Sequence, residues 1–379
     1  MEHARPARPL TTMLNMQARR DHIPLSGTFE LSPVCNLSCR MCYVRRTAQE
    51  VAAHDRPIVT LDQWKQIADE AFDAGLLFLL LTGGEPFLWP QFTELYEYLH
   101  KKGLLISINS NGSLISEEMI RWLADRPPVR INITLYGAGD ETYERLCGRK
   151  GIYHRVTETI DRLLSAGIAV KLNASMTPYN AADLEAICRF AKERGLLLEV
   201  GTYMFPPVRR LEADDGQSRF TPEEAAHYSI LAHKFRMDPE EYQKYLENAA
   251  SGIVPAPGLD ESCVDPIDGQ VRCAAGRGSF WITWDGYMIP CGMVPEPKTD
   301  IISRGFGEAW REIVQKTSDI RLSGVCRSCP DAGVCHSCMA MAYTETGKHS
   351  GIPTYLCRMA EAIREEAKLI LEPIQKETK

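Results

Sequence analysis

The sequence contains no apolar run long enough to cross a membrane. Its uninterrupted apolar stretches stay well short of the ~18 to 20 residues that a bilayer requires, and the first residues lack the apolar core of a signal peptide. We therefore expect a cytoplasmic protein that has no membrane partner.

An excess of positive charge is also missing. The 379 residues carry 43 Lys and Arg against 50 Asp and Glu, which gives a formal net charge of -7. Such a surface does not attract the phosphates of nucleic acids, so we expect no nucleic-acid partner. Residues 1–26 are locally basic, with Arg5, Arg8, Arg19 and Arg20, and are expected to form a flexible tail.

Cysteine, by contrast, is abundant, with 13 residues. Disulfides are rare in a reducing cytoplasm, so clustered thiols there indicate metal binding or reactivity. Cys147 and Cys188 stand apart from the others, and we expect both to be small buried apolar residues. The remaining thiols fall into a group near the N-terminus, a group of seven from Cys273 to Cys357, and the isolated Cys263.

The first two hundred residues alternate between apolar segments and amphipathic helical patterns. The predicted strands are residues 28–32, 77–83, 104–110, 129–137, 168–175 and 196–203. Repeated βα units favour a parallel sheet with right-handed crossovers, so we predict an α/β fold with a partial (βα)6 barrel. In such folds the functional residues lie where the strands end.

The first predicted strand is followed by "CNLSCRMC", which contains Cys35, Cys39 and Cys42. A loop can wrap three thiolates around one iron-sulfur cube and leave the remaining iron open to another ligand. A zinc site completed by a distant Cys or His is the alternative.

The next predicted strands also end in polar or glycine-rich motifs. These are "TGGEP" (82–86), "NSNG" (109–112) and "TLYG" (134–137). Glycines allow the backbone to approach a ligand closely, and Glu85 offers an acceptor for a cation such as an amine. We expect these motifs to share one rim of the sheet.

Together, "CNLSCRMCY" and "GGEP" resemble the radical S-adenosylmethionine (SAM) superfamily, whose signature is CxxxCxxC. The resemblance implies that the amino and carboxylate groups of SAM fill the open position of a 4Fe-4S cluster, and that Glu85 holds the SAM amino group. Tyr43 either lies beside the adenine or is a half-buried core aromatic. The residues implied in SAM binding are Tyr43, Gly83, Gly84, Glu85, Asn109, Asn111 and Thr134.

The C-terminal thiols resemble the SPASM domain, which follows the radical SAM core in enzymes that mature peptides. The resemblance implies two auxiliary 4Fe-4S clusters, hence three clusters in all, whereas two zinc sites are the alternative. The outer cluster would take Cys326, Cys329, Cys335 and Cys357, and the inner one Cys273, Cys291 and Cys338. Only two residues separate Cys335 from Cys338, where the family usually has three.

Four regions follow from these assignments. They are a tail (1–26), the radical SAM partial barrel (27–205), a linker and helical insertion (206–262), and the SPASM domain with a final helix (263–379). Within the last region, "FWITWDGYMIPC" predicts a β-hairpin that turns at Asp285 and Gly286.

The resemblance implies an oxidoreductase that cleaves SAM to a 5'-deoxyadenosyl radical, and three substrate classes compete. We favour maturation of a ribosomal peptide by crosslinking, epimerisation or oxidation, because "LYGAGDETYERLCG" (135–148) is similar to a subgroup that does this. Tailoring of a small molecule or tetrapyrrole is an alternative. Formylglycine formation is disfavoured, since Gly292 stands where sulfatase maturases carry an Asp. A zinc-stabilised binding protein is the distant alternative.

Two protein partners are also implied. A reductant such as flavodoxin or ferredoxin would supply the electron. Only 34 residues precede Cys35, fewer than the ~80 residues of a leader-binding module. We therefore expect the leader of a peptide substrate to be bound either elsewhere on this chain or by a separate leader-peptide-binding protein.

Cys263 provides a test of the inner cluster. Pro266 and Gly269 allow the chain to fold back, which would bring Cys263 beside Cys273 as a fourth ligand. We predict that Cys263→Ser alters the spectrum of the inner cluster and spares the other two. Iron content and spectra equal to those of the parent would instead show an open inner cluster and a structural Cys263.

Overall fold

The structure is a computed structural model that describes residues 10–207, 209–210, 216–253, 271, 273–327 and 329–377. The strands are β1 (Ser26–Glu30), β2 (Phe78–Thr82), β3 (Leu105–Ser110), β4 (Arg130–Thr134), β5 (Val170–Ser175), β6 (Leu198–Gly201), β7 (Ser279–Ile282), β8 (Tyr287–Ile289) and β9 (Thr299–Asp300).

The helices before β7 are α1 (Leu10–Asp21), α2 (Ala48–Ala52), α3 (Leu61–Asp73), η1 (Pro86–Leu88), α4 (Phe92–Lys101), α5 (Glu117–Ala124), α6 (Asp140–Cys147), α7 (Tyr153–Ser165), η2 (Ala181–Asp183), α8 (Leu184–Glu193), α9 (Pro222–Arg236) and α10 (Pro239–Ala250). Those after β7 are α11 (Ile301–Arg304), α12 (Phe306–Ser318), α13 (Gly324–Arg327), α14 (Ala332–Cys335), α15 (Met339–Thr346) and α16 (Thr354–Glu377).

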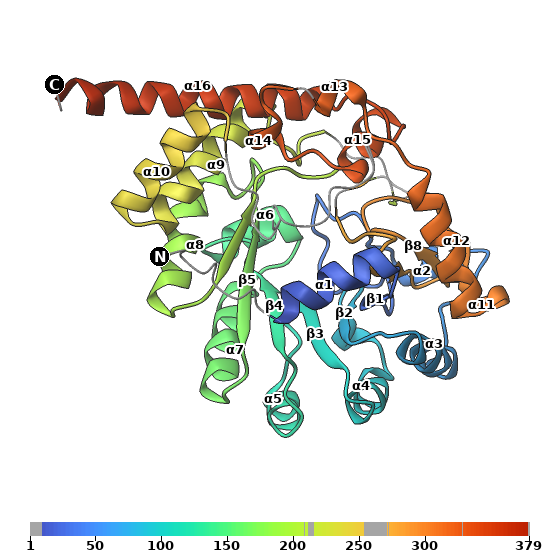
Figure 1. The fold of residues 1–379 in the computed structure, drawn as a ribbon. Coiled ribbons are helices and arrows are strands. Elements are labelled where there is room, and N and C mark those ends of the chain that lie inside the picture. Colours follow the sequence, from blue (N-terminus) through green and yellow to red (C-terminus); the bar gives the residue numbers. More distant parts are fainter. Residues whose placement is uncertain are drawn as a thin grey trace, which may run out of the picture.

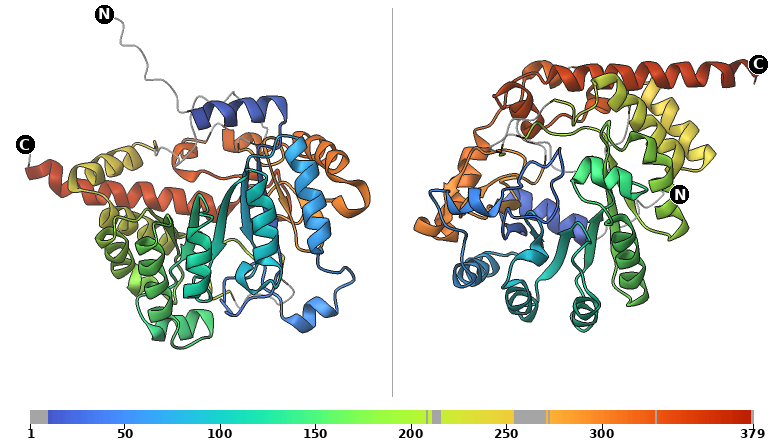
Figure 2. Two further views of the ribbon diagram at one scale, coloured as in Figure 1. Left: turned by 90° about the horizontal axis from the view of Figure 1, so that it is seen from below. Right: turned by 180° about the vertical axis from the view of Figure 1, so that it is seen from behind.

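One sheet contains all the described strands, in the order β6-β5-β4-β3-β2-β1-β7-β8-β9. Strands β1 to β6 pair in parallel, and β7 also pairs in parallel with β1. Figures 1 and 2 show the parallel strands curving around an open interior, with α3, α4, α5 and α7 on the outside. The predicted α/β fold with a partial barrel is confirmed, and all six predicted strands are present.

Alternation along the strands explains the two faces of this sheet, because successive residues point to opposite sides. Phe29 stacks on Trp64 of α3 with ring centroids 4.6 Å apart, and both side chains are fully buried. The opposite face carries both apolar residues, such as Leu80, and polar residues, such as Ser107. There the Oδ1 atom of Asn109 accepts a hydrogen bond of 2.8 Å from Nδ2 of Asn132 on the neighbouring strand.

The C-terminal region continues the same sheet. The predicted hairpin is present as β7 and β8, and Gly286 in its turn has φ of 84°, a value that favours glycine. Helix α16 packs along α9 and α10, where Ile230, Leu246 and Ile363 share one buried cluster (Figure 1). Helices α9 and α10 of the insertion therefore form part of a second hydrophobic core.

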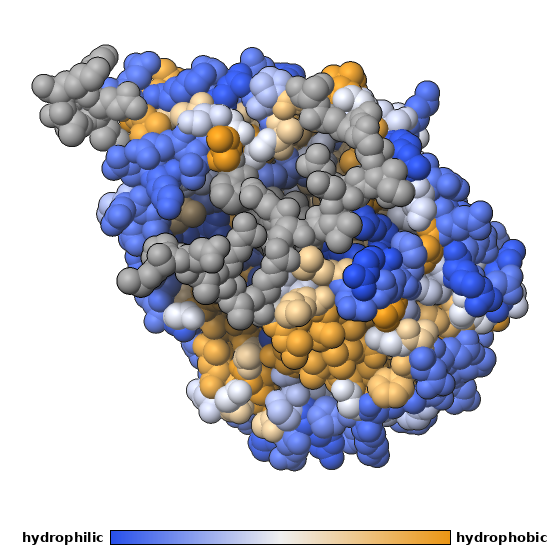
Figure 3. Space-filling view, viewed as in Figure 1, coloured by the Kyte–Doolittle hydropathy of each residue, from blue (hydrophilic) through white to orange (hydrophobic). Residues whose placement is uncertain are grey.

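Part of the predicted tail is helical. The expectation of a flexible segment is wrong for residues 10–21, which form α1. Ala18 in this helix is 2% exposed, and the indole nitrogen of Trp310 donates to the carbonyl of His22 just after it at 2.8 Å. Leu10, Met13 and Leu14 are exposed, and Figure 3 shows apolar surface on the face that Figure 1 presents.

Two further expectations can be compared with the described residues. Cys147 and Cys188 are buried, at 0% and 2% exposure, as predicted. Over the described ranges, every helix is too short or too polar to span a bilayer. The region boundaries at residues 26, 205 and 262 stay predictions.

The second core contains a histidine that makes stability depend on pH. Burial lowers the pKa of His233 from 6.5 to about 4; its ring stacks on Tyr245 with centroids 3.9 Å apart, and its Nδ1 lies 2.8 Å from the carbonyl of Ser229. The neutral ring is the form that the fold favours, so its stabilisation is complete above pH 6.5 and is lost as the pH falls towards 4.

We therefore predict that the free energy of unfolding falls less steeply between pH 7 and 4.5 in His233→Phe than in the parent. The difference should reach roughly 2 kcal/mol, as expected for a shift of this size in a partly buried group. Urea unfolding at the two pH values measures it. An equal loss in parent and variant would contradict the assignment.

Candidate active site

The first three thiols lie in the loop that leads from β1 to α2, where β1 ends. Helix α6 holds this loop by its last carbonyl groups: the amide of Ser38 donates to the carbonyl of Cys147 at 2.8 Å, and that of Arg40 to Leu146 at 3.0 Å. The loop that carries Cys35, Cys39 and Cys42 is called the SAM-cluster loop below. Its backbone is thus fixed by a helix more than one hundred residues later in the chain.

Burial disfavours the ionised, thiolate form of these cysteines in the absence of a metal. It raises the pKa of Cys35 to about 12 and is also the main cause of the raised pKa of Cys42. A hydrogen bond with the Cys147 thiol, followed by burial, raises the pKa of Cys39. Each thiolate also raises the pKa of its neighbours, so the set is suited to a cationic or iron-containing partner that would offset this repulsion.

The glycines of "TGGEP" allow two strand ends to pack together. A Cβ atom on Gly83 would lie 2.3 Å from the carbonyl oxygen of Ser32, and one on Gly84 would lie 2.4 Å from that of Val34. The backbone amide of Gly84 donates to the carbonyl oxygen of Ser32 at 2.7 Å, and that of Glu85 donates to the carbonyl oxygen of Val34 at 3.0 Å. Both glycines therefore accommodate the segment just before Cys35, and their expected contact with SAM stays a prediction.

Glu85 lies in the turn that follows β2. Its carboxylate is fully buried and accepts hydrogen bonds from the amide of Asn111 (2.8 Å), the hydroxyl of Ser110 (2.9 Å) and the amide of Phe87 (3.3 Å). Burial raises the pKa of Glu85 to about 7 despite these donors. The side chain thus joins the end of β2 to the end of β3. Its expected contact with the SAM amino group stays a prediction.

Asn111 contacts the SAM-cluster loop directly. Its Nδ2 donates to Oδ1 of Asn36 at 2.9 Å and lies 3.7 Å from the sulfur of Cys35, while its Oδ1 accepts from Ser113. Asn36 in turn donates to the hydroxyl of Ser113 at 2.8 Å. This network was not predicted, because the short polar side chains of Asn36 and Ser113 carry no distinctive spacing.

The other predicted SAM contacts lie apart from this network. Asn109 is bonded to Asn132 inside the barrel, and Thr134 lies at the end of β4. Burial, followed by the charge of Glu30, raises the pKa of Tyr43, which also interacts electrostatically with Cys42 and Cys291. The contacts of Asn109, Thr134 and Tyr43 with SAM stay predictions.

The C-terminal thiols fall into two spatial groups. The charges of Cys273 and Cys338 contribute to the raised pKa of Cys291, whose main cause is burial. In the second group, Cys326 and Cys329 contribute to the raised pKa of Cys357, and Cys326 and Cys357 to that of Cys335. Cys263 lies outside the described residues.

The thiols within each group lie near one another, but they are not yet arranged as a metal-binding site. Among the described residues, no three Cys, His, Asp or Glu side chains are arranged closely enough to hold a metal ion. The donor chemistry nevertheless fits iron-sulfur clusters, which are bound by thiolates. Among the described thiols, Cys39 is buried, Cys357 is exposed and the other assigned ligands are partly buried.

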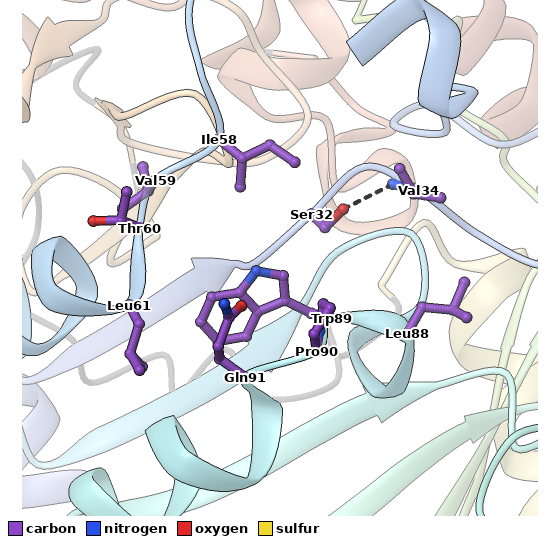
Figure 4. A pocket seen from close by; sticks show the side chains of 10 residues that line it. All are labelled: Ser32, Val34, Ile58, Val59, Thr60, Leu61, Leu88, Trp89, Pro90 and Gln91. Atoms are coloured by element: carbon purple, nitrogen blue, oxygen red, sulfur yellow. Dashed lines mark hydrogen bonds between the residues drawn. The ribbon is translucent and has the colours of Figure 1, made fainter. Parts of the chain in front are cut away.

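Two pockets lie near these loops. One of about 420 Å³ is inside the barrel, where Ser107 and Asn132 face Cys273 and Cys291. The other, of about 460 Å³, is lined by Ile58, Leu61, Trp89 and other residues shown in Figure 4, where the amide of Val34 donates to the hydroxyl of Ser32. The first pocket fits the chemistry better, because the described lining of the second contains no thiol or charged group.

Comparisons with known proteins agree with this geometry. Residues 29–191 match the profile of the Radical SAM superfamily. The chain is 26% identical over 334 residues to the AdoMet-dependent heme synthase of Methanosarcina barkeri. The match covers 85% of this chain and 93% of the heme synthase. It is also 26% identical over 329 residues to the antilisterial bacteriocin subtilosin biosynthesis protein AlbA of Bacillus subtilis. That match covers 83% of this chain and 67% of AlbA.

A solved structure extends the similarity to the whole fold. Streptococcus suis SuiB bound to precursor peptide SuiA has a TM-score of 0.64 at 17% identity, over 93% of this chain and 82% of that one. Residues 29–191 thus form a domain of the Radical SAM type. The Cys-rich C-terminal region follows it, as in the SPASM-type radical SAM maturases that the chain resembles.

The buried position of Glu85 leads to a prediction about stability. Glu85→Ala would leave three donors without their acceptor, so we expect the free energy of unfolding to fall by about 3 kcal/mol. Glu85→Gln keeps the size of the side chain and one acceptor oxygen, and should cost about 1 kcal/mol. Urea unfolding compares the two variants. A loss in Glu85→Ala no larger than that in Glu85→Gln would contradict the structural role.

Proposed function

We propose that this protein is a radical SAM enzyme with three 4Fe-4S clusters that modifies a peptide. The observation that carries the proposal is the position of Cys35, Cys39 and Cys42 on one loop at the end of β1, within the region that matches the radical SAM family. Cys39 is buried there, and the other two thiols are partly buried. When bound there, a reduced cluster supplies the electron that cleaves SAM to methionine and a 5'-deoxyadenosyl radical.

The residues of the chain have separate tasks in this reaction. Three thiolates would hold the cluster and leave one iron for the amino and carboxylate groups of SAM. Glu85 and Asn111 fix the neighbouring strand ends, so that the loop keeps one shape while SAM binds and leaves. The barrel wall excludes water from the radical, which is the main contribution that a protein makes to such a cofactor.

We assign the C-terminal thiols to two auxiliary clusters. Cys273, Cys291 and Cys338 would hold the inner cluster, and Cys326, Cys329, Cys335 and Cys357 the outer one. The electrostatic neighbours within each group support this division. Cys263 would complete the inner set, and a flavodoxin or ferredoxin would supply electrons.

Two observations support a peptide as substrate. The relatives include a bacteriocin biosynthesis protein, and a structural neighbour was solved with a precursor peptide. The inner face of the barrel also presents the amide side chains of Asn109 and Asn132, and the Oδ1 atom of Asn132 is buried without a hydrogen-bond partner. Amide groups of this kind complement the N–H and C=O groups of a peptide. A separate leader-binding protein would deliver such a substrate.

Tetrapyrrole chemistry is the second candidate, because one relative that covers most of its own length is a heme synthase. Porphyrins carry several carboxylates and call for cations in the pocket. In the described barrel, Lys171 pairs with Glu199, whereas Arg130 lines the pocket inside the barrel. We favour the peptide because of the bacteriocin biosynthesis relative and the neighbour solved with a precursor peptide.

Formylglycine formation is disfavoured for a structural reason. A Cβ atom on Gly292 would lie 2.8 Å from ring atoms of Trp281, so the indole ring fills the space that a larger residue would need. An Asp at this position, as in sulfatase maturases, would displace Trp281.

The cluster assignment is tested by SAM cleavage. We predict that replacing Cys35, Cys39 and Cys42 by Ala abolishes formation of 5'-deoxyadenosine under a strong reductant, measured by chromatography. Cys147→Ala is the matched control, because it removes a buried thiol beside Cys39 that we do not assign as a ligand. Undiminished cleavage in the triple variant would refute the radical SAM assignment. A brown protein with bound iron separates it further from a zinc protein, which is colourless.

The substrate is tested separately. We predict that incubation with SAM, reductant and short peptides encoded beside the gene changes the mass of a peptide, as detected by mass spectrometry. A parallel reaction with a porphyrin precursor should give no new absorbance spectrum. The opposite pattern would favour tetrapyrrole chemistry.

A further inference from the structure

The segment that follows β6 carries two adjacent arginines, Arg209 and Arg210, in the motif "PPVRR". Its sequence gave no indication of a role beyond that of a linker. In the structure, the two side chains reach two different loops, each of which carries thiols assigned above to a cluster.

Arg209 contacts the loop that carries Cys291, one of the thiols assigned to the inner auxiliary cluster. Its two terminal nitrogens lie 2.7 and 3.0 Å from the two carboxylate oxygens of Glu30, and Nη1 also donates to the carbonyl of Gly292 at 2.9 Å. Gly292 directly follows Cys291. The pair is deeply buried, with side-chain exposures of 10% for Arg209 and 1% for Glu30.

Glu30 is fully occupied by this arrangement. One of its oxygens also accepts a hydrogen bond of 2.9 Å from the indole nitrogen of Trp281, the residue that packs over Gly292. Because both oxygens have charged or polar donors, the carboxylate is a structural anion and not a general base. It connects the last residue of β1 to β7 and to Arg209.

Arg210 contacts the SAM-cluster loop. Its Nη1 donates at 2.9 Å to the carbonyl of Arg40, which lies between Cys39 and Cys42 in the SAM-cluster loop. Arg210 thus contacts the backbone two residues before Cys42, and Arg209 contacts the backbone of the residue that follows Cys291.

Adjacent residues have Cα atoms about 3.8 Å apart, so the two loops are held by one short piece of backbone. We propose, on the basis of the proposed function, that Arg209 and Arg210 are positioning residues that join the SAM-cluster loop to the inner auxiliary loop. Each holds its loop by a backbone carbonyl and places a positive charge near the thiolates, which favours the reduced, more negative form of the nearby cluster.

Four variants separate this role from general stability. Arg210→Gln and Arg209→Gln remove one charge each. Glu30→Gln combined with Arg209→Gln removes the buried pair as a whole, because loss of one partner leaves an unpaired buried charge. Arg219→Gln is the matched control: Arg219 forms a comparably buried pair with Glu345, at 17% and 13% exposure, but belongs to neither cluster loop.

The readouts are iron content and the midpoint potential of each cluster, followed by electron paramagnetic resonance during redox titration. Addition of SAM identifies the signal of the cluster with an open iron. We expect Arg210→Gln to shift the potential of that cluster to more negative values, and Arg209→Gln to shift that of the inner cluster. The double variant should bring the inner potential back towards the parent value, and Arg219→Gln should change neither.

Potentials that equal those of the parent in both single variants, or an equal shift in Arg219→Gln, would overturn the proposal. If Arg209→Gln does not bind iron, Arg209→Lys is compared with Arg219→Lys. Loss of inner-cluster iron in Arg209→Lys but not in Arg219→Lys supports the proposal. An equal loss of this iron in the two variants overturns it. A parent that binds iron but does not cleave SAM contradicts the proposed function instead, so the two failures are distinguishable.

Discussion

The close contact between the ends of β1 and β2 determines how the rest of the site is arranged. Backbone lies directly on backbone there, with Gly83 and Gly84 against Ser32 and Val34 at distances that no side chain would tolerate. This contact fixes where the SAM-cluster loop begins. Glu85 then leaves the same turn and binds the end of β3, so three strand ends are locked together by one short motif.

The sequence predicted those features that are encoded locally. Alternating apolar residues located all six barrel strands, and the turn at Asp285 and Gly286 located the hairpin, because periodicity and turn chemistry depend on near neighbours. The strand-end motifs were expected on one rim, since parallel strands all end on the same side. The grouping of the C-terminal thiols came from family resemblance, because spacing alone cannot pair seven thiols.

Features that depend on distant partners were not predictable from the sequence. The hydrogen bonds that Glu85 accepts were not predicted, because its partners lie 25 and 26 residues later, at the end of another strand. Arg209 and Glu30 are 179 residues apart, and neither has a distinctive neighbour pattern. Helix α1 was missed because its basic residues indicated a solvated tail, whereas Ala18 and the carbonyl of His22 anchor it to the body.

The parallel pairing of β7 with β1 has a consequence for movement. Four residue pairs join these strands, from Ser26 with Ser279 to Phe29 with Ile282, so the barrel and the hairpin share a continuous sheet. Two bodies joined in this way cannot swing apart about a hinge without breaking the hydrogen bonds of the ladder. The ladder therefore fixes the separation between the ends of β1 and β7, and with it the distance between the loops that follow these two strands.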